Sequence, residues 1–186
     1  MVLMPRVLPN SVLGAGTVNT IAAEVEAAGR ACRVRRSGSL SVPSNTRTAI
    51  TWQVEDFDTN GGGMWNPSAA SYQTIQIAGT YLIIGQVRWD DIGGFGSVYR
   101  AGLRNNYITV NSTDPSGTAC KGNVSVDASR STNGEGSTVQ VVAREALNPG
   151  DRVYLVVSQD CGSTIVGCHQ NYGGTFLDVS RISGIA

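Results

Sequence analysis

Apolar and polar residues alternate with a period of two through most of this chain, and this alternation limits the possible folds more than any other feature. In the segment 80–89, Tyr81 and Ile83 fall on one face of a strand, whereas Leu82 and Ile84 fall on the other, because successive strand side chains point to opposite faces. Both faces begin with apolar residues. We therefore expect this strand to be buried inside the fold on one side and against a neighbour on the other.

The alternation recurs in short segments that are separated by turn signals rich in Gly, Pro, Asn and Ser. The predicted strands are 32–36, 48–54, 73–78, 80–89, 100–110, 137–145, 152–159 and 175–182. Many short strands without helices between them are typical of an all-β sandwich, and about eight strands suit a jelly roll of two sheets. We therefore predict a single jelly-roll head domain over residues 31–186.

Residues 1–30 follow a different pattern. Two prolines exclude a regular helix across the first ten residues, which are predicted to be extended. Ile21 and Val25 then lie on one stripe of a predicted helix of two to three turns. So short a helix is not stable alone. We predict that residues 1–30 form an anchoring arm that a partner holds in place, and the arm lacks the continuous apolar region of a signal peptide.

The charge content is low, at 15% of residues against about 25% for an average soluble domain. Either the chain hides surface in an assembly, or a surface rich in Ser, Thr and Asn replaces the missing charges. The net charge is zero, which predicts no nucleic-acid partner. The run Arg33, Arg35 and Arg36 is interpreted as the solvent-facing side of a strand. No stretch reaches the roughly 20 apolar residues of a transmembrane span, so no membrane insertion is predicted.

The stretch VEDFDTNGGGMW, residues 54–65, begins like a calcium-binding loop at Asp56. Such a loop requires a bidentate Glu at its twelfth position, and that position holds Pro67. Asp, Asn and Gly are also the residues that turns favour. We therefore predict an acidic turn that follows a strand, with no metal site and no cofactor.

Large apolar and aromatic side chains are the candidate contact residues. The candidates for packing in the core or in a trimer interface are Tyr81, Ile83, Trp89, Met64 and Trp65. The candidates for binding a partner at the surface are Tyr99, Tyr107 and Tyr172. Aromatic rings can form platforms for sugars, but the alternating pattern favours packing in the core and between subunits.

Few residues suggest catalysis. His169 is the only histidine, and the chain lacks a Gly-x-Ser-x-Gly elbow and a phosphate-binding loop. We predict a protein that is not an enzyme and has no catalytic residues. Cys161 and Cys168 bracket a span that a hairpin disulfide could close, and two reduced thiols are the alternative.

Four segments in order resemble the globular head of the complement C1q family, within the tumour-necrosis-factor-like (TNF-like) superfamily. They are TAITWQV at 48–54, AGTYLI at 78–83, LNPGDRV at 147–153 and GTFL at 174–177. The resemblance implies a ten-stranded jelly roll that forms a homotrimer about a three-fold axis and acts by binding. No Gly-x-y collagen run precedes the head, which departs from the animal secreted proteins of the family.

The basic residues indicate a GC-rich genome, since Lys121 is the only lysine among fourteen. The sequence of residues 57–89, together with the short N-terminal arm, resembles that of head domains in minor tail proteins of phages that infect actinobacteria. This resemblance implies a non-enzymatic virion protein whose arm contacts other virion proteins and whose trimeric head adsorbs to a host-surface glycan or protein. A capsid decoration or head-fibre protein, and a bacterial secreted C1q-like binding module, are the alternatives. The expected location is the virion, and therefore extracellular after release.

Overall fold

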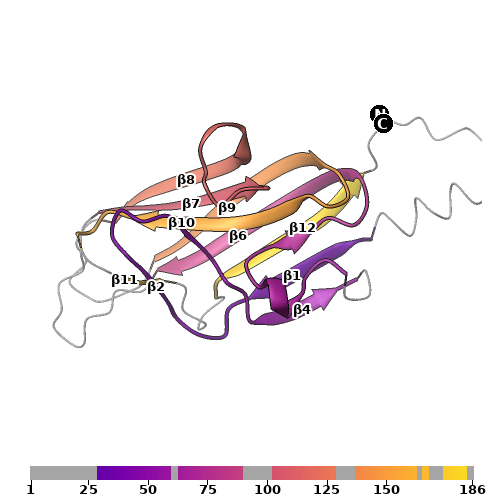
Figure 1. Cartoon of the computed structure of the whole chain (residues 1–186). Coiled ribbons are helices and arrows are strands. Elements are labelled where there is room, and N and C mark those ends of the chain that lie inside the picture. Colours follow the sequence, from indigo (N-terminus) through magenta and orange to yellow (C-terminus); the bar gives the residue numbers. More distant parts are fainter. Residues whose placement is uncertain are drawn as a thin grey trace, which may run out of the picture.

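The computed structural model describes residues 29–59, 63–89, 102–128, 137–162, 165–167 and 174–183. Over these residues the chain is all-β, with two sheets packed face to face (Figure 1). The all-β, two-sheet part of the predicted fold class is therefore confirmed, and the trimer stays a prediction. The predicted arm and its helix fall almost wholly on residues outside the described ranges. Within those ranges, no helix has the length and apolarity that crossing a membrane requires.

A seven-stranded sheet and a five-stranded sheet form the two layers. The larger sheet consists of β1 (Ala31–Arg35), β2 (Leu40–Val42), β4 (Val54–Asp58), β6 (Gly79–Trp89), β9 (Ser137–Leu147), β11 (Ile165–Gly167) and β12 (Phe176–Ser183). The smaller sheet consists of β3 (Thr48–Ala49), β5 (Gln73–Thr74), β7 (Gly102–Val110), β8 (Cys120–Ala128) and β10 (Arg152–Gln159). Two short 3-10 turns, η1 (Pro67–Ala69) and η2 (Gly117–Ala119), complete the elements.

β6 is the central strand of the larger sheet. It pairs with β9 along its whole length on one edge and with β12 and then β11 on the other. β12 pairs in turn with β1, and β1 with β4, so strands from the two ends of the described chain lie side by side. All strand pairings within both sheets are antiparallel. This antiparallel, two-layer arrangement is the one that the alternating sequence predicts.

The core lies between the sheets and is built from alternate residues. In β6 the side chains of Tyr81, Ile83 and Trp89 are at most 1% exposed, as their odd positions predict. Leu155 of β10 faces them from the other sheet and is fully buried. The even positions of β6 are only half-buried, so burial on both faces, predicted for this strand, is not found within one chain. Instead β10 has both faces buried, since Tyr154 is 8% exposed and packs against Tyr72.

A buried amide links the two sheets beside Trp89. The Nδ2 atom of Asn106, on β7, donates to the Val139 carbonyl of β9 at 2.9 Å. The Oδ1 atom of Asn106 accepts a hydrogen bond from the Trp89 indole nitrogen at 3.3 Å. Asn106 and Trp89 are both fully buried. This satisfies the polar atoms that the core would otherwise leave unpaired.

The acidic stretch is a strand rather than the predicted turn. Val54–Asp58 form β4, and the turn begins only at Thr59. A β-bulge explains how so polar a segment pairs with β1: Arg33 lies opposite Phe57 and Val34 opposite Glu55, which leaves Asp56 as the extra residue. The predicted strand 48–54 is correspondingly shorter, because only the two residues of β3 form a ladder.

Two further predictions require correction. The segment 120–128 forms β8, although no strand was predicted there, because its Lys, Gly, Asn and Asp are poor strand formers. Arg36 does not face solvent and is 5% exposed. Its guanidinium donates to backbone carbonyls, among them that of Gly38 at 2.8 Å, which offsets the cost of burying its charge.

Gly85 allows the two sheets to approach each other. A Cβ atom at this position would lie 2.6 Å from Cδ1 of Leu155 and 3.2 Å from Cγ1 of Val141. We expect Gly85→Ala to lower the free energy of unfolding by about 1–3 kcal/mol, because an extra methyl group forces a close-packed core apart. Urea unfolding measures this effect.

Gly38→Ala is the matched control for Gly85→Ala. Its added Cβ would meet only Gln53, at an ordinary 3.5 Å. The control is expected to stay within about 0.5 kcal/mol of wild type, as most surface substitutions do. Equal losses in the two variants would contradict the close approach at Gly85.

Candidate functional site

The outer face of the seven-stranded sheet carries rows of side chains that the strand register sets side by side. One row crosses five strands from β4 to β9 and consists of Phe57, Arg33, Asp178, Ile84 and Val142. A second row contains Leu82 of β6 with Arg144 of β9 on one side and Ser180 of β12 on the other. We call this surface, defined by the residues of these two rows, the outer face.

The outer face exposes apolar side chains on its two outermost strands. Val142 of β9 is 53% exposed and Phe57 of β4 is 39% exposed, and Leu82 and Ile84 are half-buried on β6, the strand next to β9. The described residues include four exposed large hydrophobic side chains, and three of them lie on strands of this sheet. A cluster of apolar side chains on one surface marks an interaction site more often than single scattered ones do.

An arginine flanked by aromatic rings occupies the β1 end of the outer face. The guanidinium of Arg33 lies 4.6 Å from the ring centroid of Phe176 and 5.7 Å from that of Phe57. Its Nη2 and Nε atoms donate to Oδ2 of Asp178 at 2.8 and 3.1 Å. Arg33 and Arg35 lie on the outward side of β1, as predicted, and both residues are half-buried. Arg33 covers Asp178, which is 8% exposed, so this end of the outer face is preorganised.

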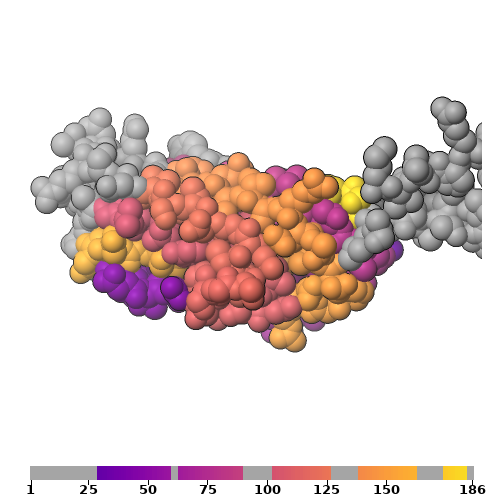
Figure 2. All heavy atoms as spheres, turned by 90° about the horizontal axis from the view of Figure 1, so that it is seen from above, coloured from indigo at the N-terminus to yellow at the C-terminus, as the bar shows by residue number. Residues whose placement is uncertain are grey.

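The opposite surface, on the five-stranded sheet, is a second candidate. Residues between 102 and 128, which include β7 and β8, lie in the middle of the view in Figure 2, with the orange residues that follow them in the chain beside them. Tyr107 of β7 is half-buried between Val156 and Asn123 of the neighbouring strands. At the edge of the same sheet, the Arg152 guanidinium lies 4.9 Å from the ring centroid of Tyr72. Of the three tyrosines predicted to bind at the surface, Tyr99 and Tyr172 lie outside the described residues.

The five predicted packing residues all lie in the core of one chain. Their exposed fractions are 1% for Tyr81, 0% for Ile83, 0% for Trp89, 2% for Met64 and 8% for Trp65. None of them reaches the outer face. Of the two predicted positions, the core and a trimer interface, these residues therefore occupy the core. The residues that line the outer face, Leu82, Ile84 and Val142, were not among the candidates. The even positions of the predicted strand 80–89 held the signal that could have identified the first two.

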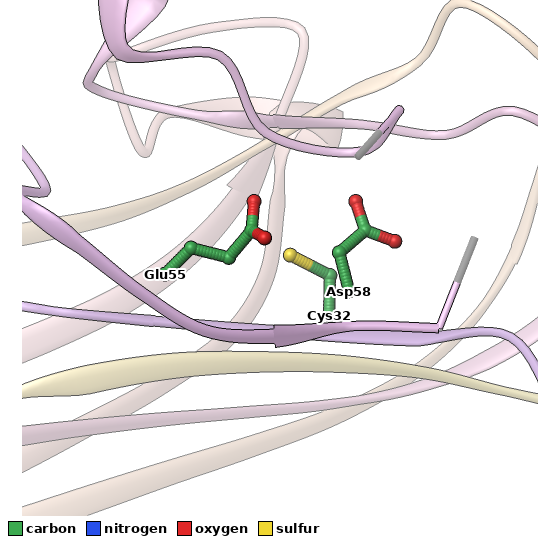
Figure 3. Close-up of side chains that lie close together, drawn as sticks. All are labelled: Cys32, Glu55 and Asp58. Carbon is green, nitrogen blue, oxygen red and sulfur yellow. The ribbon is translucent and has the colours of Figure 1, made fainter. Parts of the chain in front are cut away.

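A thiol and two carboxylates converge where β1 meets β4. The Cys32 sulfur and one carboxylate oxygen each of Glu55 and Asp58 lie within 4.8 Å of one another (Figure 3). Cys32 is fully buried, Asp58 half-buried and Glu55 exposed. Burial raises the pKa of the Cys32 thiol well above its usual range, and the carboxylates of Asp58, Glu55 and Asp178 raise it further. The thiol therefore keeps its proton at neutral pH when no cation is bound.

The acidic residue with which a calcium loop would begin is engaged elsewhere. The Oδ1 atom of Asp56 accepts a hydrogen bond from Nε of Arg35 at 2.6 Å. Cys168 and His169 lie outside the described residues, so the disulfide between Cys161 and Cys168 and the absence of a catalytic base both stay predictions.

Sequence comparison identifies a viral relative but no family. No protein-family model matches the sequence. An uncharacterized protein of Acanthamoeba polyphaga mimivirus is 31% identical over 134 residues, which are 72% of this chain. These residues cover 52% of the viral protein, so the chain spans about half the length of the curated relative it matches.

Solved structures of TNF-like proteins superpose on most of the chain. The Eiger TNF of S. frugiperda has a TM-score of 0.54 at 14% identity and covers 85% of this chain and 95% of its own. Murine APRIL has a TM-score of 0.51 at 14% identity, with coverages of 82% and 98%. The globular domain of zebrafish complement 1qA has a TM-score of 0.49, also at 14% identity, with coverages of 84% and 99%. The Eiger and APRIL superpositions show that the chain has a TNF-like jelly-roll fold, so the predicted resemblance is confirmed at the level of fold.

Proposed function

We propose that the protein is a non-enzymatic structural component of a bacteriophage virion. In this proposal the jelly-roll head forms a homotrimer, residues 1–30 anchor it to other virion proteins, and the head contacts the host surface as a minor tail protein. Capsid decoration by the same trimer is the alternative that the experiments below separate from it.

The outer face is the observation that carries the proposal. It exposes Val142 on the strand next to the half-buried Leu82 and Ile84, and three of the four exposed large hydrophobic side chains among the described residues lie on strands of this sheet. Contact with a second copy would remove these side chains from water, which contributes roughly 25 cal/mol per Å² of apolar surface. Arg33 and Asp178, already paired within one chain, do not need to lose a hydrogen bond when such a contact forms. A trimer also multiplies weak contacts to a cell surface by avidity.

Two further observations support a virion role. A relative of this chain is a viral protein, and every strand ladder among the described residues lies within Ala31–Ser183, so these ladders do not require residues 1–30. The only histidine, His169, is at a position that the structure does not describe, so the lack of enzymatic activity remains part of the proposal.

Deletion of residues 1–30 tests the anchoring role. We expect the shortened protein to fold and to be absent from purified particles, because all strand pairs of the described residues are retained while the proposed anchor is lost. Circular dichroism measures the folding, and quantitative mass spectrometry of particles from complemented infections measures incorporation. Full-length Leu103→Ala, a change at an exposed side chain of the other sheet, is the control and is expected to be incorporated normally. Normal copy number of the shortened protein would contradict anchoring by the arm.

The position of the protein on the particle decides between adsorption and decoration. Cryo-electron microscopy of particles that carry a tagged copy is expected to show the label at the tail. Label spread over the capsid would replace the adsorption role with decoration. A particle without label would contradict both.

A further inference from the structure

The structure assigns a zinc-binding site to the cluster of Cys32, Glu55 and Asp58, where the thiolate and the two carboxylates would hold the ion and water would complete its coordination. The site links β1 to β4 and does not depend on where in a virion the protein lies. It differs from the calcium loop considered at Asp56, because neither Asp56 nor the residues after Asp58 take part.

The β-bulge brings the three residues together. In a regular strand Glu55 and Asp58, three positions apart, would point to opposite faces. The extra residue, Asp56, restores both to the face that Cys32 occupies, because Asp58 lies opposite Cys32 and Glu55 lies opposite Val34. Figure 3 shows the Cys32 sulfur between the two carboxylate groups, with all three side chains pointing away from the strands in the same direction. Bulges often serve to re-aim a side chain next to a functional site.

The Cys32 thiol is the observation that points to a ligand. Cys32 is 0% exposed, and none of the hydrogen bonds within the described chain involves its sulfur. The sulfur faces the carboxylates of Glu55 and Asp58. A carboxylate oxygen each of Glu55 and Asp58 also lies within 4.8 Å of the other and of the sulfur, so three potential ligand atoms face one point.

The mixture of ligand atoms selects the metal. Calcium and magnesium take oxygen ligands, so a central thiolate disfavours them. Zinc accepts sulfur at about 2.3 Å and carboxylate oxygen at about 2.0–2.2 Å. At tetrahedral angles, ligand atoms on one zinc ion are about 3.4–3.6 Å apart, so atoms that already lie within 4.8 Å of one another could hold the ion after small side-chain movements. Asp58 is also held in place, because one of its oxygens accepts a hydrogen bond from the Met64 backbone nitrogen at 2.9 Å.

Titration of the full-length, reduced protein with Zn²⁺ or Co²⁺ tests the assignment. We expect one ion to bind per chain in isothermal calorimetry, and Co²⁺ to give the thiolate-to-metal absorption band in the near ultraviolet. Cys32→Ala is expected to abolish that band. Glu55→Gln changes an exposed side chain and should leave the fold intact while it weakens binding at least about tenfold, the lower limit for loss of a group that supports a metal site.

Matched controls exclude other cysteines and acids. Asp56→Asn removes the neighbouring acid outside the cluster, and Cys120→Ala removes a thiol of β8. Both are expected to bind Zn²⁺ and Co²⁺ like wild type. A wild-type protein that binds neither ion would overturn the assignment. So would a Co²⁺ band that persists in Cys32→Ala, or equal affinity in Glu55→Gln and Asp56→Asn, because binding would then occur at other residues.

Discussion

Val142→Arg is expected to convert the protein from trimers into single chains. Val142 is 53% exposed on the outer face and lies directly opposite Ile84 in the strand register. An arginine there would bring a charge into the proposed contact, and burial of an unpaired charge costs several kcal/mol. Multi-angle light scattering should give three times the 19.5 kDa chain mass for wild type and the mass of one chain for the variant.

The control for this substitution lies on the other sheet. Leu103 on β7 is 43% exposed, so Leu103→Arg makes the same chemical change at similar exposure and is expected to remain trimeric. A wild-type protein with the mass of one chain would refute the trimer. A trimeric Val142→Arg variant would show that the subunits meet elsewhere than on the outer face.

Trp89→Ala is expected to cause the largest loss of stability among the core substitutions considered. Trp89 is fully buried at the end of β6, and its indole nitrogen donates to Asn106. Truncation removes the largest kind of side chain and leaves a cavity, which lowers the free energy of unfolding by about 3–5 kcal/mol. Urea unfolding at a fixed protein concentration measures the loss, because subunit association changes apparent stability.

Two further variants separate the contribution of the indole hydrogen bond from that of the buried ring. Trp89→Phe keeps much of the ring but leaves the Asn106 oxygen without its donor, so its loss should be smaller, about 1–3 kcal/mol. Leu103→Ala, at an exposed position, should stay within about 0.5 kcal/mol of wild type. A Trp89→Ala protein as stable as Leu103→Ala would contradict the core position of the indole ring.

The fold could be predicted because its main strands have distinct apolar patterns. β6 and β9 contain buried residues at alternate positions, whereas β10 has a continuous buried run. The segments predicted for these three strands agree with the structure to within two residues at each end. β8 escaped prediction because Cys120–Ala128 is an edge strand of polar and small residues, whose pairing with β7 depends on a partner far away in the chain.

The candidate sites were harder to predict than the fold. The alternation in β6 indicates that Leu82 and Ile84 share a face, but the register that places Val142 beside Ile84 is set by contacts between distant strands. The cluster at Cys32 depends on one extra residue in β4, and a bulge shifts every later side chain to the opposite face. The acids of β4 have the composition of a turn, so local preference gave the wrong element there.

The central position of β12 has a consequence for synthesis of the protein. Phe176–Ser183 lies between β1 and β6 in the larger sheet. Because β12 is synthesised last, β1 and β6 cannot complete their pairing until translation reaches it. While the ribosome is still translating, β1 and β6 have an open edge where β12 belongs. Such unpaired edges favour pairing with other chains. Nascent chains that stall before residue 176 are therefore the form of this protein that most needs a chaperone.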